Sequence, residues 1–371
     1  MKKFLFLTGF IFCLSCFLFA GKFKGAPVLK VYKDPQLTNF FKRESGWIAS
    51  DGGYSIPMDN GKVLWTFGDS YTNDYDKATG TVPCLFNVRN DCMLQPHNNW
   101  DWRQTKTVLG PKGSTLFHSD TAANHFNWPG SGIQVKDTAY VYVLNMKNVS
   151  TGMGFDYGGP DAFAKLKLPE MTPAGYHVLQ NFKGINFGIG FIKNEKDGYV
   201  YAYGQKSLSF GKLNIYVARF PISSPNADWA FWDGNAWFNG VDKAAAITTI
   251  SSFSPNVVKV KDKYLIFSSA FSVGCDQGKD IYVAVSNSLT GPFSDKKMIY
   301  TIPDTVKGHS PFFYLPVGHP EYINDKDELL LTYSINGYGT CVPPCANNHY
   351  DPDYYRPRGI RIPLKLIDPG L

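Results

Sequence analysis

Short segments in which apolar and polar residues alternate recur along nearly the whole chain, and this pattern restricts the fold more than any other feature. Alternation with a period of two is typical of β-strands that have one buried face. The clear segments are 28–32, 54–58, 63–67, 139–144, 187–192, 199–203, 214–218, 264–268, 281–285, 328–333 and 360–362, and weaker ones are 132–135, 177–179, 256–259, 298–301 and 311–315. We therefore predict an all-β chain of about 16 strands or more, with short helices only at 161–168 and 243–247.

The strands are expected to form one domain that spans residues 26–371. The turn-forming residues, 35 Gly and 24 Pro, are spread between the segments and do not gather into a linker. An aromatic-Val-Tyr type of motif returns at uneven intervals in AYVYVLN, GYVYAYG, NIYVARF and DIYVAVS. This favours a β-propeller of four or five blades with loops of variable length, and a large two-sheet sandwich is the alternative.

The first 20 residues have the composition of a secretory signal peptide. Two lysines precede an apolar run that ends on the small residue Ala20. We therefore predict a secreted or periplasmic protein without a stable membrane span after cleavage. An uncleaved membrane anchor is one alternative, and a lipid anchor on Cys16 is another, because Leu14-Ser15-Cys16 loosely resembles a lipoprotein cleavage site.

Five cysteines follow the predicted signal peptide: Cys84, Cys92, Cys275, Cys341 and Cys345. Export to an oxidising compartment favours disulfide bonds. The shortest closures would join Cys84 to Cys92 and Cys341 to Cys345, which leaves Cys275 unpaired, but spacing does not determine connectivity. The spacings fit no zinc motif and no Gly-rich phosphate loop opens a helix, so we predict neither a metal site nor an organic cofactor.

Charge and aromatic content indicate the class of ligand. The formal net charge is +6 and includes two lysines of the predicted signal peptide, which is too little over this length to indicate nucleic-acid binding. Aromatic residues make up 16% of the chain. Flat rings at strand ends can stack on sugars, so we predict a polysaccharide or other glycan as partner, with Trp47, Tyr71 and Trp128 among the substrate-binding residues.

Residues 46–71 contain the candidate catalytic pair. Two apolar segments flank Asp59-Asn60-Gly61, residue types that favour a tight hairpin turn. A three-residue loop places Asp51 directly opposite Asp69, and two adjacent carboxyl groups can differ in pKa and serve as acid and base. A two-residue loop would instead pair Asp51 with Ser70 and separate the carboxylates. Both aspartates could also be ordinary turn residues.

The same segment, SDGGYSIPMDNGKVLWTFGDSY, resembles the opening of a family of secreted bacterial five-bladed propellers similar to glycoside hydrolases. Characterised relatives of that family are endo-D-arabinanases, and many members have no assigned substrate. Further resemblances are FNWPGSGIQV (126–135), GYVYAYG (198–204), LTGPF (289–293), HPEYINDKDELLLTYSIN (319–336) and YRPRGIRIPL (355–364).

The resemblance implies a five-bladed propeller with a central funnel and two essential aspartates that match Asp51 and Asp69. Ser131 stands where relatives often have an acidic residue after Trp-Pro-Gly, which leaves a third carboxylate and the substrate class open. We therefore predict an exported glycoside hydrolase that cleaves arabinofuranosyl or related furanose linkages with this pair. The alternatives are a noncatalytic glycan-binding or surface-attached propeller, and a lyase or transferase on the same sugars.

Four residues near the C-terminus complete the predicted substrate-binding set. His319 and Glu321 alternate on an extended segment, Asn336 follows the next strand, and Arg356 lies beside two tyrosines. All four could line the funnel. For His319 and Glu321 the alternative is a buried structural pair, and for Arg356 a solvated or salt-bridged cation.

Overall fold

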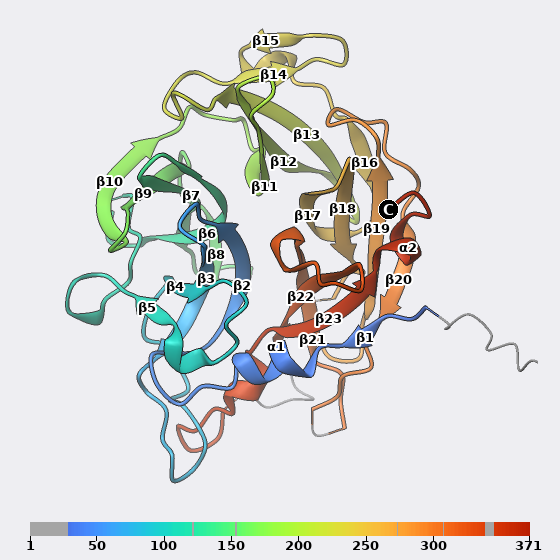
Figure 1. Ribbon diagram of the computed structural model, residues 1–371. Helices are drawn as coiled ribbons and strands as arrows, with labels where there is room; N and C mark the ends of the chain where they lie inside the picture. The colour runs from blue at the N-terminus through green and yellow to red at the C-terminus, as the bar shows by residue number, and fades with distance from the viewer. Residues whose placement is uncertain (1–28, 121, 153, 273, 307, 338–344) are drawn as a thin grey trace, which may run out of the picture.

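The protein folds into five β-sheets arranged as blades around a central axis (Figure 1). This description rests on a computed structural model that describes residues 29–371, apart from 121, 153, 273, 307 and 338–344. The predicted all-β, five-bladed propeller is confirmed.

The blades follow one another along the chain. Blade I consists of β2 (Trp47–Pro57), β3 (Lys62–Thr72), β4 (Asp91–Pro96) and β5 (Lys106–Val108), and blade II of β6 (His125–Val135), β7 (Thr138–Asn148), β8 (Phe155–Tyr157), β9 (Ala162–Lys167) and β10 (Thr172–Val178). Blade III consists of β11 (Asn186–Asn194), β12 (Tyr199–Ser209), β13 (Lys212–Pro221), β14 (Ala230–Trp232), β15 (Trp237–Asn239) and β16 (Thr248–Ile250). Blade IV consists of β17 (Phe253–Val260), β18 (Lys263–Ser269), β19 (Asp280–Ser286) and β20 (Lys297–Thr301), and blade V of β21 (Phe312–His319), β22 (Glu328–Asn336), β23 (Arg358–Pro363) and β1 (Tyr32–Lys33).

The two ends of the described chain close the ring. The innermost strands β2, β6, β11, β17 and β21 contact one another in order, and β21 returns to β2. The outermost strand of blade V is β1, which pairs with β23 and brings Tyr32 opposite Arg361. Figure 1 shows this first strand beside the last one. The N-terminal strand predicted at 28–32 is thus observed at 32–33, and residue 28 lies outside the described residues.

Most of the apolar core lies between neighbouring blades. Separate clusters of buried side chains join blades I and II, II and III, III and IV, IV and V, and V and I. The last of these includes Leu37 and Phe40 of helix α1 (Pro35–Phe40), which begins at the capping residue Asp34. The apolar faces of the predicted strands therefore stabilise the contact between blades, because a single blade cannot bury both faces alone.

Both predicted helices are wrong. Residues 161–168 contain strand β9, whose Ala164 pairs with Val141 of β7. Residues 243–247 contain only the end of a single 3₁₀ turn (Val241–Lys243). In β9, burial against the adjacent blades overrides the weak helical preference of the sequence, whereas residues 243–247 are exposed or half-buried.

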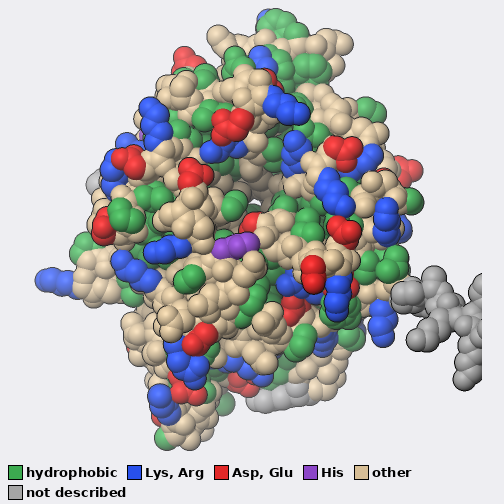
Figure 2. All heavy atoms as spheres, in the orientation of Figure 1, with side chains coloured by type: hydrophobic (Ala, Val, Ile, Leu, Met, Phe, Trp, Pro, Cys, Tyr) green, Lys and Arg blue, Asp and Glu red, His purple; other side chains and the backbone are tan. Residues whose placement is uncertain are grey.

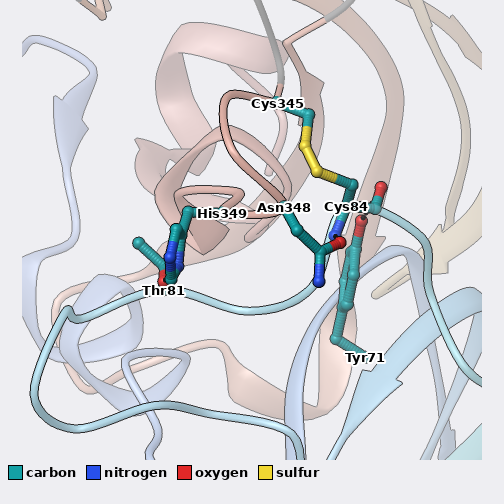
Figure 3. Close-up of a disulfide and its surroundings, with 6 residues drawn as sticks. All are labelled: Tyr71, Thr81, Cys84, Cys345, Asn348 and His349. Atoms are coloured by element: carbon teal, nitrogen blue, oxygen red, sulfur yellow. Dashed lines mark hydrogen bonds between the residues drawn. A yellow bond between two sulfur atoms is a disulfide. The ribbon is translucent and has the colours of Figure 1, made fainter.

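The structure corrects the shortest-closure disulfide pattern. Cys84, in the connection between β3 and β4, is bonded to Cys345 across a sequence separation of 261 residues (Figure 3). Cys92, predicted to pair with Cys84, is a free buried thiol on β4, and Cys275, predicted to be unpaired, is disulfide-bonded. Cys341 lies outside the described residues. The pattern based on sequence proximity is wrong because ring closure places blade I beside a C-terminal segment that is distant in sequence.

The predicted signal peptide and the possible lipid site at Cys16 lie outside the described residues, so export stays a prediction. In the described part of the chain, every helix is too short or too polar to cross a bilayer. Figure 2 shows one face of the molecule, on which positively and negatively charged side chains are intermixed.

Candidate active site

The five blades converge on a cavity of about 910 Å³. Its lining includes inner-strand residues from every blade, so it lies where the blades meet at the axis. The carboxylates of Asp51 and Asp69 line it, together with aromatic side chains and a few amides. Aromatic and other side chains that line it are Tyr54, Trp128, Phe155, Asp156, Tyr157, Asn186, Gln205, Lys206, Phe253, Phe312, Tyr314, Asn336 and Tyr355.

The hairpin β2–β3 brings the two aspartates together, in a geometry that differs from the predicted one. The predicted register holds near the turn, where Tyr54 faces Thr66 and Ile56 faces Leu64. Toward the cavity the register shifts, and Asp51 lies between the pairs Ser50–Ser70 and Gly52–Phe67. One residue of β2 thus lies opposite both Gly68 and Asp69 of β3, which is a β-bulge. The prediction that Asp51 and Asp69 form a directly opposed pair is therefore wrong, because Asp51 lies opposite both Gly68 and Asp69.

Glycine permits this bulge. Gly52 and Gly53 have φ values of +95° and +84°, in the left-handed region that other residues rarely adopt. Gly68 allows the carboxylate of Asp51 to approach the opposite strand, because a Cβ atom added there would lie 2.4 Å from Asp51 Oδ1. The glycines in the Asp51-Gly52-Gly53 and Gly68-Asp69 sequences are therefore needed for the local geometry of the site.

Gly68→Ala is therefore expected to displace the Asp51 carboxylate while leaving the fold intact. A misplacement of about 1 Å at a catalytic group can lower turnover by about 100-fold. We expect a loss of glycan-cleaving activity of that order, with a thermal unfolding midpoint near that of the wild type. Full activity in the folded variant would contradict a requirement for the close approach of Asp51 to Gly68.

Two phenol groups contact Asp51, which lines the cavity. The hydroxyl of Tyr314 donates a hydrogen bond to Asp51 Oδ2 over 2.7 Å, and the hydroxyl of Tyr355 donates a second one. Burial raises the pKa of Asp51, and the two phenols oppose that rise because they stabilise the carboxylate. The same negative charge and burial raise the pKa of Tyr314, which keeps its proton available for the hydrogen bond.

Asp69 is half-buried, with a side chain that is 14% exposed. Burial and the charge of Asp51 raise the pKa of Asp69 to about 7, although Arg89 and a hydrogen bond from Trp128 oppose the rise. The guanidinium of Arg89 lies 3.3 Å from Asp69 Oδ1 and is held over the ring of Phe126. Within this coupled pair, the two phenol donors favour the charge on Asp51, and the proton remains on Asp69. The site can therefore supply a proton donor and a carboxylate at neutral pH.

Two of the predicted substrate-binding residues line the cavity. Trp128 on β6 lies beside Asp69, and its ring packs edge-on against Phe155. Asn336, at the end of β22, hydrogen-bonds Tyr314, the residue that holds Asp51.

Two predicted aromatic contacts are corrected. Trp47 is completely buried between blades I and V, and its indole nitrogen donates to Ser50 Oγ over 2.8 Å. Tyr71 is 4% exposed, stacks on Tyr350, and donates its hydroxyl hydrogen to the carbonyl of Cys84. Neither ring presents a face to the cavity, because each contributes to packing.

Three polar candidates also lie outside the cavity lining. His319 is fully buried between Ser55 and Thr332, and burial lowers the pKa of its imidazole to about 3, so the ring is neutral. Glu321 Oε1 lies 3.8 Å from His319 Nδ1. These contacts fit the alternative of a buried structural pair.

Arg356 is also structural. It is 5% exposed, and its guanidinium donates to the backbone carbonyls of Ile48 and Arg43 and to the carboxylate of Asp353. Arg356 therefore links the C-terminal segment to blade I by hydrogen bonds. The prediction that it binds substrate is corrected, because it does not line the cavity.

The sequence reasoning missed the partners of the aspartates. Tyr314 and Tyr355 come from segments far along the chain, and Arg89 lies in the connection after β3. No local spacing links these residues to Asp51 or Asp69. Among the described residues, no group of three or more His, Cys, Asp and Glu side chains is placed to hold a metal ion.

Comparisons with known proteins agree with the fold. A family model described as a domain of unknown function (DUF5005) matches residues 34–363. A crystal structure from Bacteroides ovatus ATCC 8483, provisionally described as a hydrolase, is similar with a TM-score of 0.72, 19% identity and 90% of each chain covered. A xylan β-1,4-xylosidase from Bacillus halodurans C-125 has a TM-score of 0.50 and 10% identity over 88% of this chain, which spans about half (53%) of that protein. No curated protein sequence matches.

Proposed function

This chain belongs to the DUF5005 family, whose function is unassigned, and we propose that it is a glycoside hydrolase that uses Asp51 and Asp69. The observation that carries the proposal is the pair of half-buried carboxyl groups on one bulged hairpin, in a cavity at the propeller axis. Their environments favour a proton on Asp69 and a charge on Asp51. Two carboxyl groups with divided protonation states are what glycosidic cleavage requires.

The proposed reaction assigns one role to each aspartate. Asp69 donates its proton to the glycosidic oxygen, so that the C–O bond breaks and the departing sugar leaves with a hydroxyl group. Asp51 removes a proton from an attacking water molecule or attacks the anomeric carbon itself. Tyr314 and Tyr355 hold the Asp51 carboxylate in place, and Arg89 orients Asp69.

The cavity lining supports a glycan as substrate. Its exposed surface is mostly apolar, with the rings of Trp128, Phe155 and Phe312 available for stacking on sugars. Asn336, Asn186 and Gln205 offer amide groups for hydroxyl recognition. We propose arabinofuranosyl or related furanose linkages as the first candidates, on the basis of the sequence resemblance, with action outside the cytoplasm.

The experiment that tests this function is release of reducing ends from a panel of arabinan, arabinogalactan, galactan and xylan. We expect the wild type to cleave at least one member of the panel. Tight binding to one glycan with no release over prolonged incubation would instead support the noncatalytic glycan-binding alternative. Release of an unsaturated product, detected by ultraviolet absorbance, would indicate a lyase.

The pH dependence follows from the raised pKa of Asp69. An acid with a pKa of about 7 loses its catalytic proton as the pH rises through that value, so kcat/KM should fall on the alkaline side. On the acidic side, kcat/KM should fall as Asp51 becomes protonated. A profile of kcat/KM against pH measures both limbs. A profile that stays flat from neutral to strongly alkaline pH would exclude Asp69 as the acid.

A further inference from the structure

A second, smaller groove adjoins the catalytic cavity between blades II and III. It has a volume of about 370 Å³, and one wall is the segment 157–161 that follows β8. The opposite wall is formed by Gln180–Asn181 and the residues before β11. Tyr157, Gly184 and Asn186 line both the groove and the catalytic cavity. The two spaces therefore share a border of three residues.

Part of the border has no side chain, because one of its three residues is Gly184. Gly184 has a φ of +82°, which disfavours any other residue there, and a Cβ atom would have only Lys206 within 4 Å. Asn186 is held in place because its Oδ1 accepts a hydrogen bond from the backbone of Gly188 over 2.8 Å. A ligand can thus extend from the cavity into the groove over a surface of backbone, amide and ring.

The groove is fixed before any ligand arrives. Asp161 accepts hydrogen bonds from the hydroxyl of Tyr142 and from the backbone of Asn145, the latter over 3.0 Å. The backbone of Gly158 is bonded to the carbonyl of Asn145 over 2.8 Å. On the other side, Phe182 is 5% exposed and packs against Trp229 in the blade II–III core. A rigid groove binds without the entropy cost of ordering its walls.

The chemistry of the lining indicates what would bind. Tyr157 is 57% exposed, which is unusual for a large ring on a strand and leaves an aromatic face available. Gln180 and Asn181 are exposed amides, and Asp161, the only ionisable acid or base in this lining besides the Tyr157 phenol, is engaged by Tyr142 and Asn145. Aromatic and amide groups without an available charge suit a neutral sugar and disfavour uronic acids or phosphates.

From these observations we infer that the groove is a distal subsite, which binds neutral sugar units of a glycan chain whose scissile bond lies at Asp51 and Asp69. The inference rests on the proposed hydrolase function and adds to it. The protein would prefer polymers or long oligosaccharides over short ones, because only a long chain occupies both the cavity and the groove. Tyr157 and Gln180 would act in binding and specificity and would take no part in bond cleavage.

The test compares substrates of different lengths. Oligosaccharides of increasing length are prepared from the panel polysaccharide that the wild type cleaves, and kcat/KM is measured for Tyr157→Ala and Gln180→Ala. Loss of one stacking contact worth roughly 1.4 kcal/mol should lower kcat/KM on long substrates about tenfold for Tyr157→Ala. The Gln180 side chain lines the groove alone, so in Gln180→Ala the shortest cleaved substrate, which does not reach the groove, should be affected less than about twofold. Met298→Ala is the control, since Met298 is 55% exposed on the outer strand β20.

The outcomes separate this inference from the function on which it rests. An equal loss on short and long substrates in Gln180→Ala, or no loss on either in both variants, would overturn the distal subsite while leaving the hydrolase intact. If the wild type cleaves no glycan, the proposed function fails, and the groove is tested by affinity electrophoresis in gels containing each polysaccharide. Retardation of the wild type that is weakened in Tyr157→Ala and kept in Met298→Ala would still support a glycan site. Equal migration of all three proteins would overturn it.

Discussion

Asp69→Asn is expected to be more stable than the wild type at neutral pH and nearly inactive. In the unfolded chain an aspartate ionises near pH 3.9, whereas in the folded protein the pKa of Asp69 is raised to about 7. The folded state therefore binds the proton more tightly, and stability falls as the pH rises from about 4 to 7. Asn cannot ionise and avoids this loss, so the free energy of unfolding at pH 7 should rise by about 4 kcal/mol.

The activity of the same variant should fall by about 1,000-fold or more, because the amide cannot protonate the leaving oxygen. Urea denaturation at several pH values measures the stability difference, which should disappear near pH 4. A variant that is less stable than the wild type at pH 7 would contradict the raised pKa. Retention of wild-type activity would contradict the assignment of Asp69 as the acid.

Loss of the disulfide is expected to cause the largest fall in stability. The Cys84–Cys345 bond closes a loop with a sequence separation of 261 residues, so it greatly restricts the unfolded chain. Loop-closure entropy for a loop of this size corresponds to roughly 5 kcal/mol. It is also a covalent link between blade I and the connection between β22 and β23 of blade V (Figure 3).

The double variant Cys84→Ser/Cys345→Ser should therefore unfold at a much lower urea concentration than the oxidised wild type. Wild type unfolded in a thiol reductant lacks the same bond without a sequence change, and it also loses the disulfide of Cys275, so it should unfold at a urea concentration no higher than that of the double variant. Equal unfolding midpoints for oxidised wild type and double variant would show that strand pairing alone closes the ring.

Local patterns predict a large part of this structure, because the relevant interactions lie close together in the sequence. Alternation marks the strands, and Asp59-Asn60-Gly61 marks the turn that sets the register from Tyr54 to Pro57. The same local reasoning brings Asp51 and Asp69 to one end of the hairpin. It misses the bulge, because glycine permits a positive φ without requiring it, so the sequence does not show that Gly52 and Gly53 adopt one.

The remaining features depend on contacts between distant segments. Tyr314 reaches Asp51 across 263 residues of sequence, and the Cys84–Cys345 bond forms because the ring closes. An aromatic residue next to a catalytic motif is equally compatible with packing, so Trp47 and Trp128 could not be distinguished before the blades were placed. Burial alone separates them, since Trp47 lies in the blade I–V core and Trp128 faces the cavity.

The measurement that tests the central claim most directly is the initial rate of reducing-end release by the wild type, Asp51→Asn, Asp69→Asn and Asp59→Asn. The last variant is the matched control, because Asp59 is an exposed turn residue at the opposite end of the same hairpin. We predict that release is abolished in Asp51→Asn and Asp69→Asn and unchanged in Asp59→Asn, with all four proteins folded. Wild-type rates in both Asp51→Asn and Asp69→Asn would contradict the account and place the chemistry elsewhere.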